Sequence, residues 1–497
     1  MSRTPLFAVL RRAAGLARMA SRPGAPGLSE LADPAFHRSP LSRRTLLAAG
    51  AMLPALPARA ASDARVAILG GGLAGLVVAD RLRAAGMRNV TLYEASNRTG
   101  GRTLSARDVL GPGTVVEFGG SFINSDHADM LALAQRFGLP VEDGQSGEAA
   151  SLETTFFVAG ERRGLAEIAA SASSLVAHLA RLKRRPKAEQ DALSAAAVLD
   201  GARVSGWSRR LIDIGLTQEM GLEPERMSGL HLIDAFAADH RTPSLGLFGS
   251  DQRYQIAGGN DRVAAALAAT LNDRIRLGRR VEAIRPAGRA YRLSFAGGHE
   301  VTADLVVLAL PLTTLRQVHL GMDLPPLTRR AILETRYGSN AKLFAGLSAR
   351  PWRAARQNGE CIGDVGAQSV WEDDARPGTG PGALTIFAGG RAGMGFASGV
   401  PADRARAVLH ATDRALPGVA AGFTGRAART HWPSSPYALG SYSCFGPNQY
   451  EGLSEALGPA GQVHFAGERA SGDHSGYMNG AAESGRVTAE GILRRIR

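Results

Sequence analysis

The chain has 497 residues, of which 44% are hydrophobic and 21% are charged, the balance of an ordinary globular protein. This length allows two or three domains of about 100–200 residues each. No run of about 18 apolar residues occurs, which argues against a membrane-spanning helix, so no stable membrane insertion is expected.

The formal net charge of +13 does not indicate a nucleic-acid partner. Nine arginines and two acidic residues give residues 1–60 a charge of +7, which is more than half of the excess. The remaining positive charge is scattered, apart from the run Arg-Leu-Lys-Arg-Arg-Pro-Lys at residues 181–187. Such a run is typical of a solvated helix end. We therefore expect no binding to nucleic acid.

Residues 1–60 have the features of an export signal with a basic segment before it. The segment Ser-Arg-Arg-Thr-Leu-Leu, with its arginines at Arg43 and Arg44, resembles the twin-arginine signal. An apolar stretch at residues 46–56 follows, and Ala-Arg-Ala at 58–60 fits a small-x-small cleavage site. This order predicts recognition by the twin-arginine translocation machinery and a periplasmic or extracellular mature protein. Cys361 and Cys444 have no metal or redox spacing, which is compatible with an oxidising compartment.

The next segments predict the beginning of a Rossmann unit. Residues 65–69 form a short apolar strand, residues 73–85 an Ala- and Leu-rich helix, and residues 90–94 a second strand. The stretch 161–235 then has helical spacing and few strand-forming residues.

β-rich sequence begins near residue 276. Its strands are expected at 279–284, 291–295 and 301–310, with a hairpin turn at 296–298. The tract from 373 to 395 is rich in Gly and Pro and is predicted to be loop-heavy. A strand-like segment at 461–467 and a final helix at 480–496 follow.

The turn between the first strand and the first helix fits the pattern G-x-G-x-x-G. Gly70 suits the tight turn, Gly72 would let the backbone approach a pyrophosphate, and Gly75 would let the helix pack on the strand. Glu94 ends the next strand, where an acidic residue takes the ribose hydroxyls of a dinucleotide. Strand, turn, helix and acid together predict dinucleotide binding, but they do not choose between NAD and FAD.

Four further motifs resemble those of the flavin-containing amine oxidase family, which includes monoamine, polyamine and L-amino-acid oxidases. In chain order the motifs are Glu-Ala-Ser-Asn-Arg-Thr-Gly-Gly-Arg at 94–102, Val-Glu-Phe-Gly-Gly-Ser at 116–121, Val-His-Phe-Ala-Gly-Glu at 463–468 and Ser-Gly-Tyr-Met at 475–478. The resemblance extends from about residue 65 to the C-terminus. It implies an FAD enzyme.

The resemblance also implies where FAD lies. Gly100, Gly101 and Arg102 are expected against the isoalloxazine ring and the pyrophosphate. Glu468 is expected beside the ribityl and phosphate groups, and the Met478 backbone at the pyrimidine edge. An elongated dianionic cofactor needs such arginine and backbone N–H groups along its length. Further residues expected to contact FAD are Leu73, Ala74, Ala95, Gly119, Gly120, Ser121, Val281, Trp432 and Gly467.

Two tyrosines resemble the pair that monoamine oxidases place face to face before the flavin. Tyr477 lies in Ser-Gly-Tyr-Met, and Tyr442 lies in Tyr-Ala-Leu-Gly-Ser-Tyr-Ser at 437–443. Two ring faces would orient an amine nitrogen and screen the reacting carbon from water. The alternative is that both are core tyrosines with satisfied hydroxyl groups.

Lysine is rare, and this rarity draws attention to one position. Only Lys183, Lys187 and Lys342 occur among 58 basic residues, and Lys342 stands alone in apolar sequence. Arginine cannot replace a compact ammonium whose pKa can fall on burial. The family carries a lysine here that holds a water beside flavin N5, so Lys342 is expected to act in the same way. Methionine, of similar volume, is expected to preserve the fold at this position.

Two departures from the family narrow the expected chemistry. Ser441 occupies the position of the cysteine that tethers FAD in animal monoamine oxidases, so the cofactor should be non-covalent. L-Amino-acid oxidases carry an arginine after the second glycine motif to clamp the substrate carboxylate. Residues 119–123 here contain no basic residue, which favours an amine without a carboxylate.

The sequence therefore predicts an FAD-dependent oxidase that acts on a small-molecule amine. The resemblance implies that a hydride equivalent passes from the amine α-carbon to flavin N5, that the imine hydrolyses, and that O2 reoxidises the flavin to give H2O2. An L-amino-acid oxidase and an FAD-dependent desaturase or dehydrogenase remain as alternatives within the superfamily. Outside it, an NAD-dependent dehydrogenase and a non-catalytic flavin-binding protein remain. The 11 histidines show no zinc-binding spacing, so no metal site is predicted.

The expected fold is α/β, with a Rossmann-type FAD-binding domain interleaved with an α+β substrate domain of mixed sheet and helices. After the signal, the FAD-binding domain is expected at 61–150, 251–310 and 441–497. The substrate domain is expected at 151–250, where it is mainly helical, and at 311–440.

Overall fold

The computed structural model describes residues 63–147, 151–237, 251–373 and 380–496. The predicted export signal at residues 1–60 lies outside these ranges. Among the described helices, none is long and apolar enough to cross a membrane.

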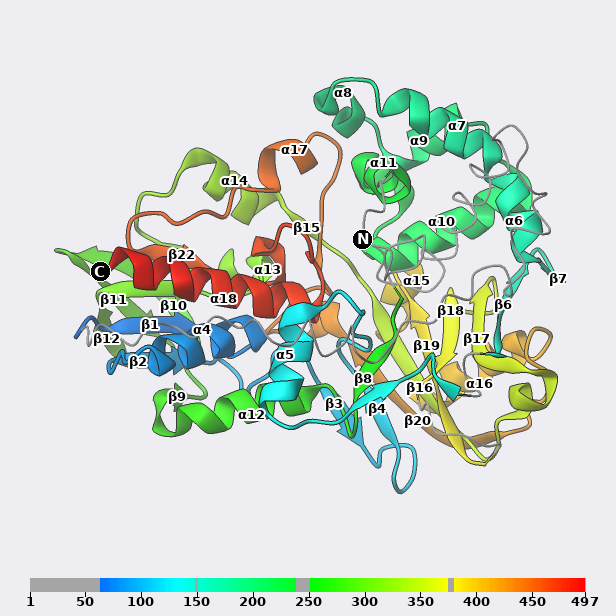
Figure 1. The fold of residues 1–497 in the computed structure, drawn as a ribbon, viewed down its shortest axis with the longest axis horizontal. Helices are drawn as coiled ribbons and strands as arrows, with labels where there is room; N and C mark the ends of the chain where they lie inside the picture. The colour runs from blue at the N-terminus through cyan, green and yellow to red at the C-terminus, as the bar shows by residue number, and fades with distance from the viewer. Residues whose placement is uncertain (1–62, 148–150, 238–250, 374–379, 497) are drawn as a thin grey trace.

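A five-stranded parallel sheet, called here the parallel sheet, forms the centre of one half of the molecule (Figure 1). Its central strand β1 pairs in parallel with β2 on one side and with β13 on the other. Both faces of β1 are buried, which explains its continuous apolar sequence. In spatial order the strands are β22 (Val463–Phe465), β13 (Leu305–Leu308), β1 (Val66–Leu69), β2 (Val90–Tyr93) and β9 (Ile275–Arg276).

Alternate residues of β1 pack against different layers. Val66 and Ile68 contact a helical layer, in which the C-terminal helix α18 lies beside α4 (Figure 1). Ala67 and Leu69 contact a four-stranded sheet on the opposite face. The helices are α4 (Leu73–Ala84), α5 (Ala128–Arg136), α12 (Asp261–Leu271) and α18 (Met478–Arg495), and the strands are β10 (Val281–Ala287), β11 (Ala290–Phe295), β12 (Glu300–Ala303) and β14 (His319–Leu320). The predicted βαβ beginning and the hairpin near residue 297 are both confirmed.

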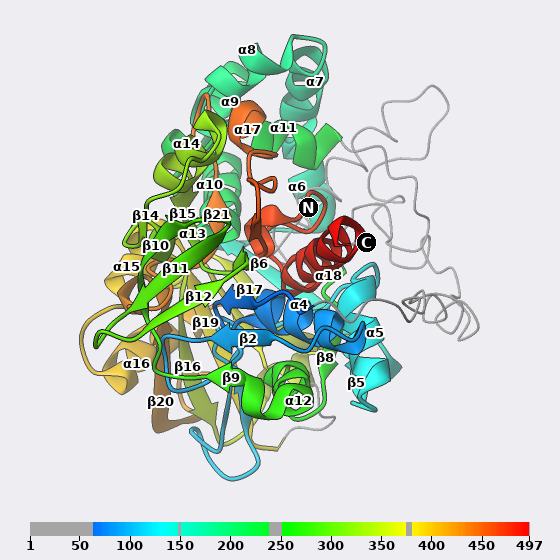
Figure 2. The same ribbon diagram turned by 90° about the vertical axis from the view of Figure 1, so that its left-hand side faces the viewer.

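A seven-stranded mixed sheet forms the centre of the other half (Figure 1). Figure 2 shows α7, α8, α9 and α11 gathered at one end of the molecule. In spatial order the strands are β20 (Phe423–His431), β16 (Ala341–Leu347), β19 (Gly382–Ala388), β18 (Ser369–Glu372), β17 (Gln357–Gly363), β6 (Glu153–Val158) and β7 (Glu161–Arg162). The helices are α6 (Leu165–Ser171), α7 (Ser173–Leu182), α8 (Lys187–Ala192), α9 (Ala195–Gly201), α10 (Gly206–Met220), α11 (Leu230–Ala237) and α16 (Pro401–Thr412).

The alternation along β16 positions a functional side chain. Leu343, Ala345 and Leu347 pack into a core that includes residues of α16. Phe344 belongs to a different cluster on the opposite face. Because side chains alternate along a strand, Lys342 shares the Phe344 face and points away from the α16 core.

Each half is assembled from segments that are far apart in the chain, which confirms the interleaved α/β fold. Shorter elements connect or flank the two halves. They are β3 (Ser105–Arg107), β4 (Val115–Glu117), β5 (Val141–Asp143), β8 (Tyr254–Ile256), α13 (Leu312–Leu315), α14 (Pro326–Glu334), β15 (Arg336–Tyr337), α15 (Gly390–Gly395), β21 (Ser443–Cys444) and α17 (Tyr450–Leu453).

The expectation of a loop-heavy tract at 373–395 is wrong for its described second half. Residues 382–388 form β19, a fully buried inner strand, and α15 follows. The glycines at both ends of β19 serve close packing. A Cβ on Gly382 would lie 2.7 Å from Arg350 Nε, and one on Gly389 would lie 2.4 Å from the Thr217 carbonyl oxygen. The last helix is longer than predicted, since it begins at Met478.

Candidate functional site

One long cavity is lined by residues from both halves of the molecule. Every residue predicted to bind cofactor or substrate lines it, except Gly75. These lining residues are Gly70, Gly72, Leu73, Ala74, Glu94, Ala95, Gly100, Gly101, Arg102, Gly119, Gly120, Ser121, Val281, Lys342, Trp432, Tyr442, Gly467, Glu468, Tyr477 and Met478.

The three motif glycines have different surroundings. Gly70 has a φ of 111°, which favours glycine, and its N–H donates to the Tyr93 carbonyl at 2.8 Å. A Cβ on Gly75 would lie only 2.1 Å from the Gly70 carbonyl oxygen, so Gly75 allows the helix to pack behind the turn. A Cβ on Gly72 would meet no atom within 4 Å. The space at Gly72 is therefore open to a ligand.

The N-terminus of α4 is suited to an anion. Gly72 is its N-cap, no side chain caps the helix, and its first turn has no acidic residue. Helix N-termini carry N–H groups without intrahelical partners and a partial positive charge. The opening at Gly72 therefore presents backbone donors to a phosphate.

Glu94 holds the turn and remains able to accept more hydrogen bonds. Its Oε2 accepts the Gly71 N–H at 2.7 Å, and its Oε1 accepts the N–H and the hydroxyl of Ser96 at 2.8 and 2.7 Å. A carboxylate has about four acceptor positions. At least one remains for a ribose hydroxyl in the cavity.

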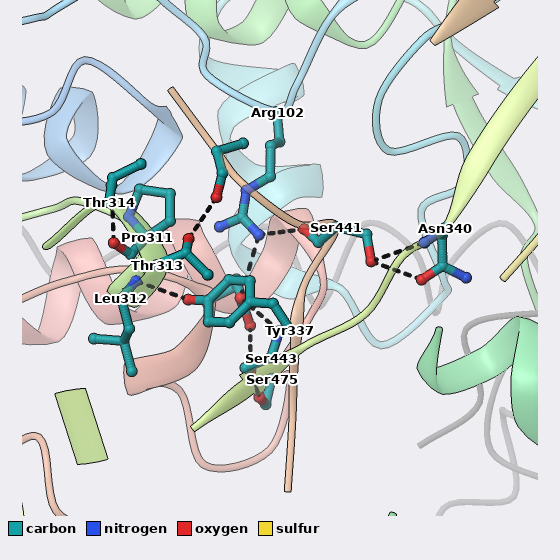
Figure 3. A network of polar contacts seen from close by, with 12 residues as sticks. Arg102, Pro311, Leu312, Thr313, Thr314, Tyr337, Asn340, Ser441, Ser443 and Ser475 are labelled. Atoms are coloured by element: carbon teal, nitrogen blue, oxygen red, sulfur yellow. Dashed lines mark hydrogen bonds and ion pairs between the residues drawn. The ribbon is translucent and has the colours of Figure 1, made fainter. Parts of the chain in front are cut away.

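A polar network in the cavity wall includes Arg102, Ser441 and Asn340 (Figure 3). Arg102 donates to the Ser441 carbonyl and approaches Glu468 Oε1 at 3.4 Å. Glu468 also accepts the N–H and the hydroxyl of Ser443 at 3.2 and 3.0 Å. The Ser441 hydroxyl donates to Asn340 Oδ1 at 2.6 Å. The network joins four distant segments at the place expected for the flavin.

Close packing explains three further glycines of the site, namely Gly101, Gly119 and Gly120. A Cβ on Gly119 would lie 1.8 Å from the Arg102 carbonyl oxygen, and one on Gly120 would lie 2.8 Å from Met478 Cγ. Gly101 has a φ of 58° and approaches the Gly72 backbone. Trp432 is fixed by donating its indole N–H to the Phe118 carbonyl at 3.2 Å.

Lys342 is held by three protein acceptors. Its Nζ donates to the carbonyl oxygens of Glu117 and Gly119 at 2.8 and 2.7 Å and to the Ser121 hydroxyl at 2.6 Å. An ammonium has three N–H donors, so these bonds use all of them. Burial lowers the pKa of Lys342, and a neutral amine there would have a lone pair for a water. The water-holding role beside N5 stays a prediction.

Two buried carboxyl groups face this lysine. Asp373 and Glu117 both oppose the fall in the pKa of Lys342. Burial raises the pKa of Glu117, while hydrogen bonds from the Asn260 N–H and the Ser105 hydroxyl, both at 2.8 Å, oppose that rise. Asp373 accepts hydrogen bonds from the Trp371 indole and the Thr385 hydroxyl. Sequence reasoning missed both carboxyl groups as partners of Lys342, because the three residues come from distant segments.

Aromatic side chains surround Lys342 and line the same cavity. The Trp371 ring lies 5.6 Å from Lys342 Nζ and contacts the rings of Phe122 at 5.9 Å and Phe387 at 5.3 Å. Phe387 is also the cross-strand partner of Lys342. Sequence reasoning missed these three residues, although the position of Phe122 directly after the second glycine motif was a usable signal.

The predicted tyrosine pair lines this cavity as well. The Tyr442 hydroxyl donates to the Gln218 carbonyl of α10 at 3.2 Å, which fixes its ring from the helical side. Tyr477 is the N-cap of α18, and its ring lies 4.9 Å from that of the buried His127. The structure thus brings both rings to one cavity, and their role as an amine cage stays a prediction.

Comparisons with known proteins agree with this site. The family model for flavin-containing amine oxidoreductases matches residues 73–493. The chain is 28% identical over 450 residues to AofH of Mycobacterium tuberculosis, a candidate flavin-containing monoamine oxidase, with 85% of this chain and 95% of that one covered. It is 25% identical to (S)-6-hydroxynicotine oxidase of Paenarthrobacter nicotinovorans, with 86% and 98% covered. The structure of cyclohexylamine oxidase from Brevibacterium oxydans matches with a TM-score of 0.77 at 25% identity, covering 88% and 100%.

Proposed function

The chain belongs to the family of flavin-containing amine oxidoreductases, and we propose that it oxidises amines with an apolar body that carry neither a carboxylate nor a second ammonium group. It is an FAD-dependent oxidoreductase that acts on amines. The observation that supports the narrower proposal is the aromatic lining around Lys342.

The residues of the cavity fit FAD. The open space at Gly72 and the uncapped α4 N-terminus suit the pyrophosphate, and Glu94 suits the adenosine ribose. Ser441 has a hydroxyl group where a tethering cysteine would be needed, and that hydroxyl donates to Asn340. FAD is therefore held non-covalently.

When bound, FAD accepts the hydride equivalent from the amine α-carbon. The protein's own residues orient the substrate. Tyr442, anchored through its hydroxyl, and Tyr477 present aromatic faces that receive an amine and exclude water. Lys342 holds the carbonyl groups of Glu117 and Gly119 in place, and with them the glycine segment that lines the cavity.

The charges of the cavity favour a substrate with one polar group. Among the described lining residues, the only carboxylates are Glu94 and Glu468, and both are engaged in the cofactor half. The lining arginines belong to the segments 98–102 and 279–280. The described aromatic part of the lining holds no carboxylate for a second ammonium and no arginine for a carboxylate. The three N–H donors of Lys342, which lies among these aromatic residues, are already used by the protein. A buried charge without a partner is costly.

An amine panel tests this proposal by the release of H2O2, which also tests O2 as the electron acceptor. Benzylamine and cyclohexylamine are expected to give kcat/KM values at least about 100-fold above those of putrescine and L-phenylalanine, because an unpaired buried charge costs about 3–5 kcal/mol. A preference for putrescine or for L-phenylalanine would contradict the proposed substrate class. Turnover without H2O2, measured with an artificial acceptor, would contradict O2 as the acceptor.

We also propose export by the twin-arginine pathway, which carries folded, cofactor-loaded proteins. The support is the order of the twin arginines, the apolar stretch and Ala-Arg-Ala in residues 42–60. The double variant Arg43→Lys with Arg44→Lys is expected to leave an unprocessed, flavin-loaded protein in the cytoplasm. Immunoblotting of periplasmic and cytoplasmic fractions measures this. The substitution of both residues of the pair Arg11 and Arg12 by lysine is the matched control. Equal periplasmic yields from both double variants would contradict export by this pathway.

A further inference from the structure

Four titratable residues form a cluster behind Tyr477, called here the histidine cluster. They are Asp126, His127, His474 and Glu483. His127 is the N-cap of α5, and Tyr477 is the N-cap of α18. The starts of these two helices are joined, since the Met130 N–H donates to Asn479 Oδ1 at 3.0 Å. The cluster therefore lies where two helix N-termini meet beside the cavity.

The tautomer of His127 follows from its contacts. Its Nδ1 accepts the backbone N–H of Asn124 at 3.1 Å, so this nitrogen carries no proton. The side chain is fully buried, and burial lowers the pKa of His127 to about 3. The imidazole is therefore neutral, with its single proton on Nε2. That nitrogen faces Asp126 Oδ1 at 4.0 Å.

The His127 ring is held on two sides. It makes a T-shaped contact with the Tyr477 ring, with centroids 4.9 Å apart and an interplanar angle of 69°. It also lies perpendicular to the ring of His474 at 5.4 Å. His474 is in turn fixed by Glu483 Oε2 at 3.0 Å and faces Asp126 Oδ2 at 3.8 Å. Tyr477 thus contacts the His127 ring, which cannot rotate without losing its polar contacts.

We propose that His127 is a positioning residue, which holds the Tyr477 ring in the cavity wall through the contact between the two rings. The inference rests on the proposed role of Tyr477 in orienting the amine. On this proposal, the hydrogen bond from the Asn124 N–H to His127 stabilises the fold, and the contact between the His127 and Tyr477 rings supports substrate binding. No substrate contact by His127 is required, because the residue acts through Tyr477.

A metal site is the competing interpretation of the same cluster, because ligand atoms of Asp126, His127 and His474 lie within 4.8 Å of one another. The His127 tautomer argues against it. A metal-binding histidine nitrogen must offer a lone pair, and Nε2 carries the proton. His474 is also bracketed by two carboxylates, whose hydrogen bonds outweigh burial and raise its pKa. A raised pKa favours the protonated form, which cannot bind a metal.

The test separates the ring of His127 from its acceptor nitrogen. His127→Asn retains an acceptor for the Asn124 N–H and removes the ring, whereas His127→Phe retains a ring and removes the acceptor. The probe is α,α-dimethylbenzylamine, which has no α-hydrogen and cannot be oxidised, and calorimetry of the flavin-loaded enzyme measures its affinity. We expect His127→Asn to weaken binding about 10-fold, the scale of one aromatic contact, and His127→Phe to bind within about 2-fold of wild type.

A double-mutant cycle shows whether the effect passes through Tyr477. In a Tyr477→Ala background, His127→Asn is expected to change the affinity by less than about 2-fold. His464→Asn is the matched control, since His464 is a buried histidine of β22 outside the cavity lining, and it should leave the affinity unchanged in both backgrounds.

Three results would overturn the inference. The first is an equal loss from His127→Asn in both backgrounds, and the second is a loss from His127→Phe as large as that from His127→Asn. The third is unchanged affinity in Tyr477→Ala alone, which would refute the role of Tyr477 itself. Flavin content and melting temperature, measured first, identify any variant that fails to fold. If His127→Asn fails in this way, a 10-fold loss in His127→Phe still overturns the inference.

Discussion

Replacing Gly75 by alanine is expected to destabilise the protein, whereas replacing Gly72 by alanine is expected to leave the fold intact and to weaken FAD binding. A Cβ on Gly75 would lie 2.1 Å from the Gly70 carbonyl oxygen, and backbone cannot move aside as a flexible side chain can. We expect a loss of about 3 kcal/mol or more in the free energy of unfolding. Urea unfolding monitored by tryptophan fluorescence measures it.

Gly72→Ala is the matched variant for comparison with Gly75→Ala. Its φ of −71° suits alanine, and its Cβ would meet no protein atom within 4 Å. The new methyl group would instead occupy the space open to the phosphate. Hydrogen bonds to a charged group contribute about 1.5–3 kcal/mol each, so losing one would weaken FAD binding about 10- to 100-fold. Titration of deflavinated protein with FAD measures the affinity. Normal FAD affinity in Gly72→Ala would contradict the placement of the pyrophosphate.

The cofactor half of the site could be predicted because its requirements are local. The motif glycines and Glu94 lie within one strand–turn–helix–strand unit, so their spacing alone fixes their relative positions. The φ of Gly70 and the packing of Gly75 are consequences of the same short segment. This local unit therefore indicated a Rossmann fold and a dinucleotide ligand, and the family resemblance identified the dinucleotide as FAD.

The prediction of a loop-heavy tract failed because the glycines there allow close packing and do not mark turns. The run Ala-Leu-Thr-Ile-Phe-Ala at 383–388 is a typical buried strand, but the glycines around it suggested loops. Gly382 and Gly389 prove to be sites of close approach to Arg350 and Thr217. Only the tertiary contacts distinguish these two uses of glycine.

Part of the substrate half escaped prediction, for a different reason, although Lys342, Tyr442 and Tyr477 do line the cavity as predicted. Lys342 was identified by its rarity, but its carboxylate partner Asp373 and the aromatic Trp371 lie on other strands of the seven-stranded sheet or beside it. His127 and His474 come from distant segments of the chain. No periodicity in one sequence relates such residues, since segments that are distant in the chain bring them together only in the folded protein.

Replacing Lys342 by methionine is expected to destabilise the protein, which differs from the expectation based on side-chain volume. The substitution removes the donor to Glu117, Gly119 and Ser121 and the positive charge that faces two buried carboxyl groups. Loss of one partner from a buried charged group costs about 3–5 kcal/mol. FAD binding should also weaken, because Gly119 and Ser121 line the cofactor cavity. Urea unfolding at saturating FAD and FAD titration measure these two effects.

The loss of stability in Lys342→Met should depend on pH. The direction of this pH dependence shows whether the buried carboxyl group of Glu117 causes the loss. Burial already raises the pKa of Glu117, and loss of the lysine raises it further. A carboxyl group with a raised folded-state pKa binds more protons in the folded than in the unfolded protein, so stability falls as pH rises above the unfolded pKa. The deficit relative to wild type should therefore be larger at about pH 8 than at about pH 6.

A second substitution completes this test. Glu117→Gln in the Lys342→Met background removes the charge and keeps an acceptor for the Asn260 N–H or the Ser105 hydroxyl, so it should recover part of the stability and reduce the pH dependence. Lys342→Arg keeps a positive charge, but the guanidinium cannot donate three hydrogen bonds from one nitrogen. The stability of this variant should therefore have nearly the wild-type pH dependence, whereas its FAD affinity should stay below that of wild type. If Lys342→Met is as stable as wild type at both pH values, the ammonium does not hold these segments together. The water-holding role at the flavin would then be the one to test, by comparing reduction by substrate with reoxidation by O2.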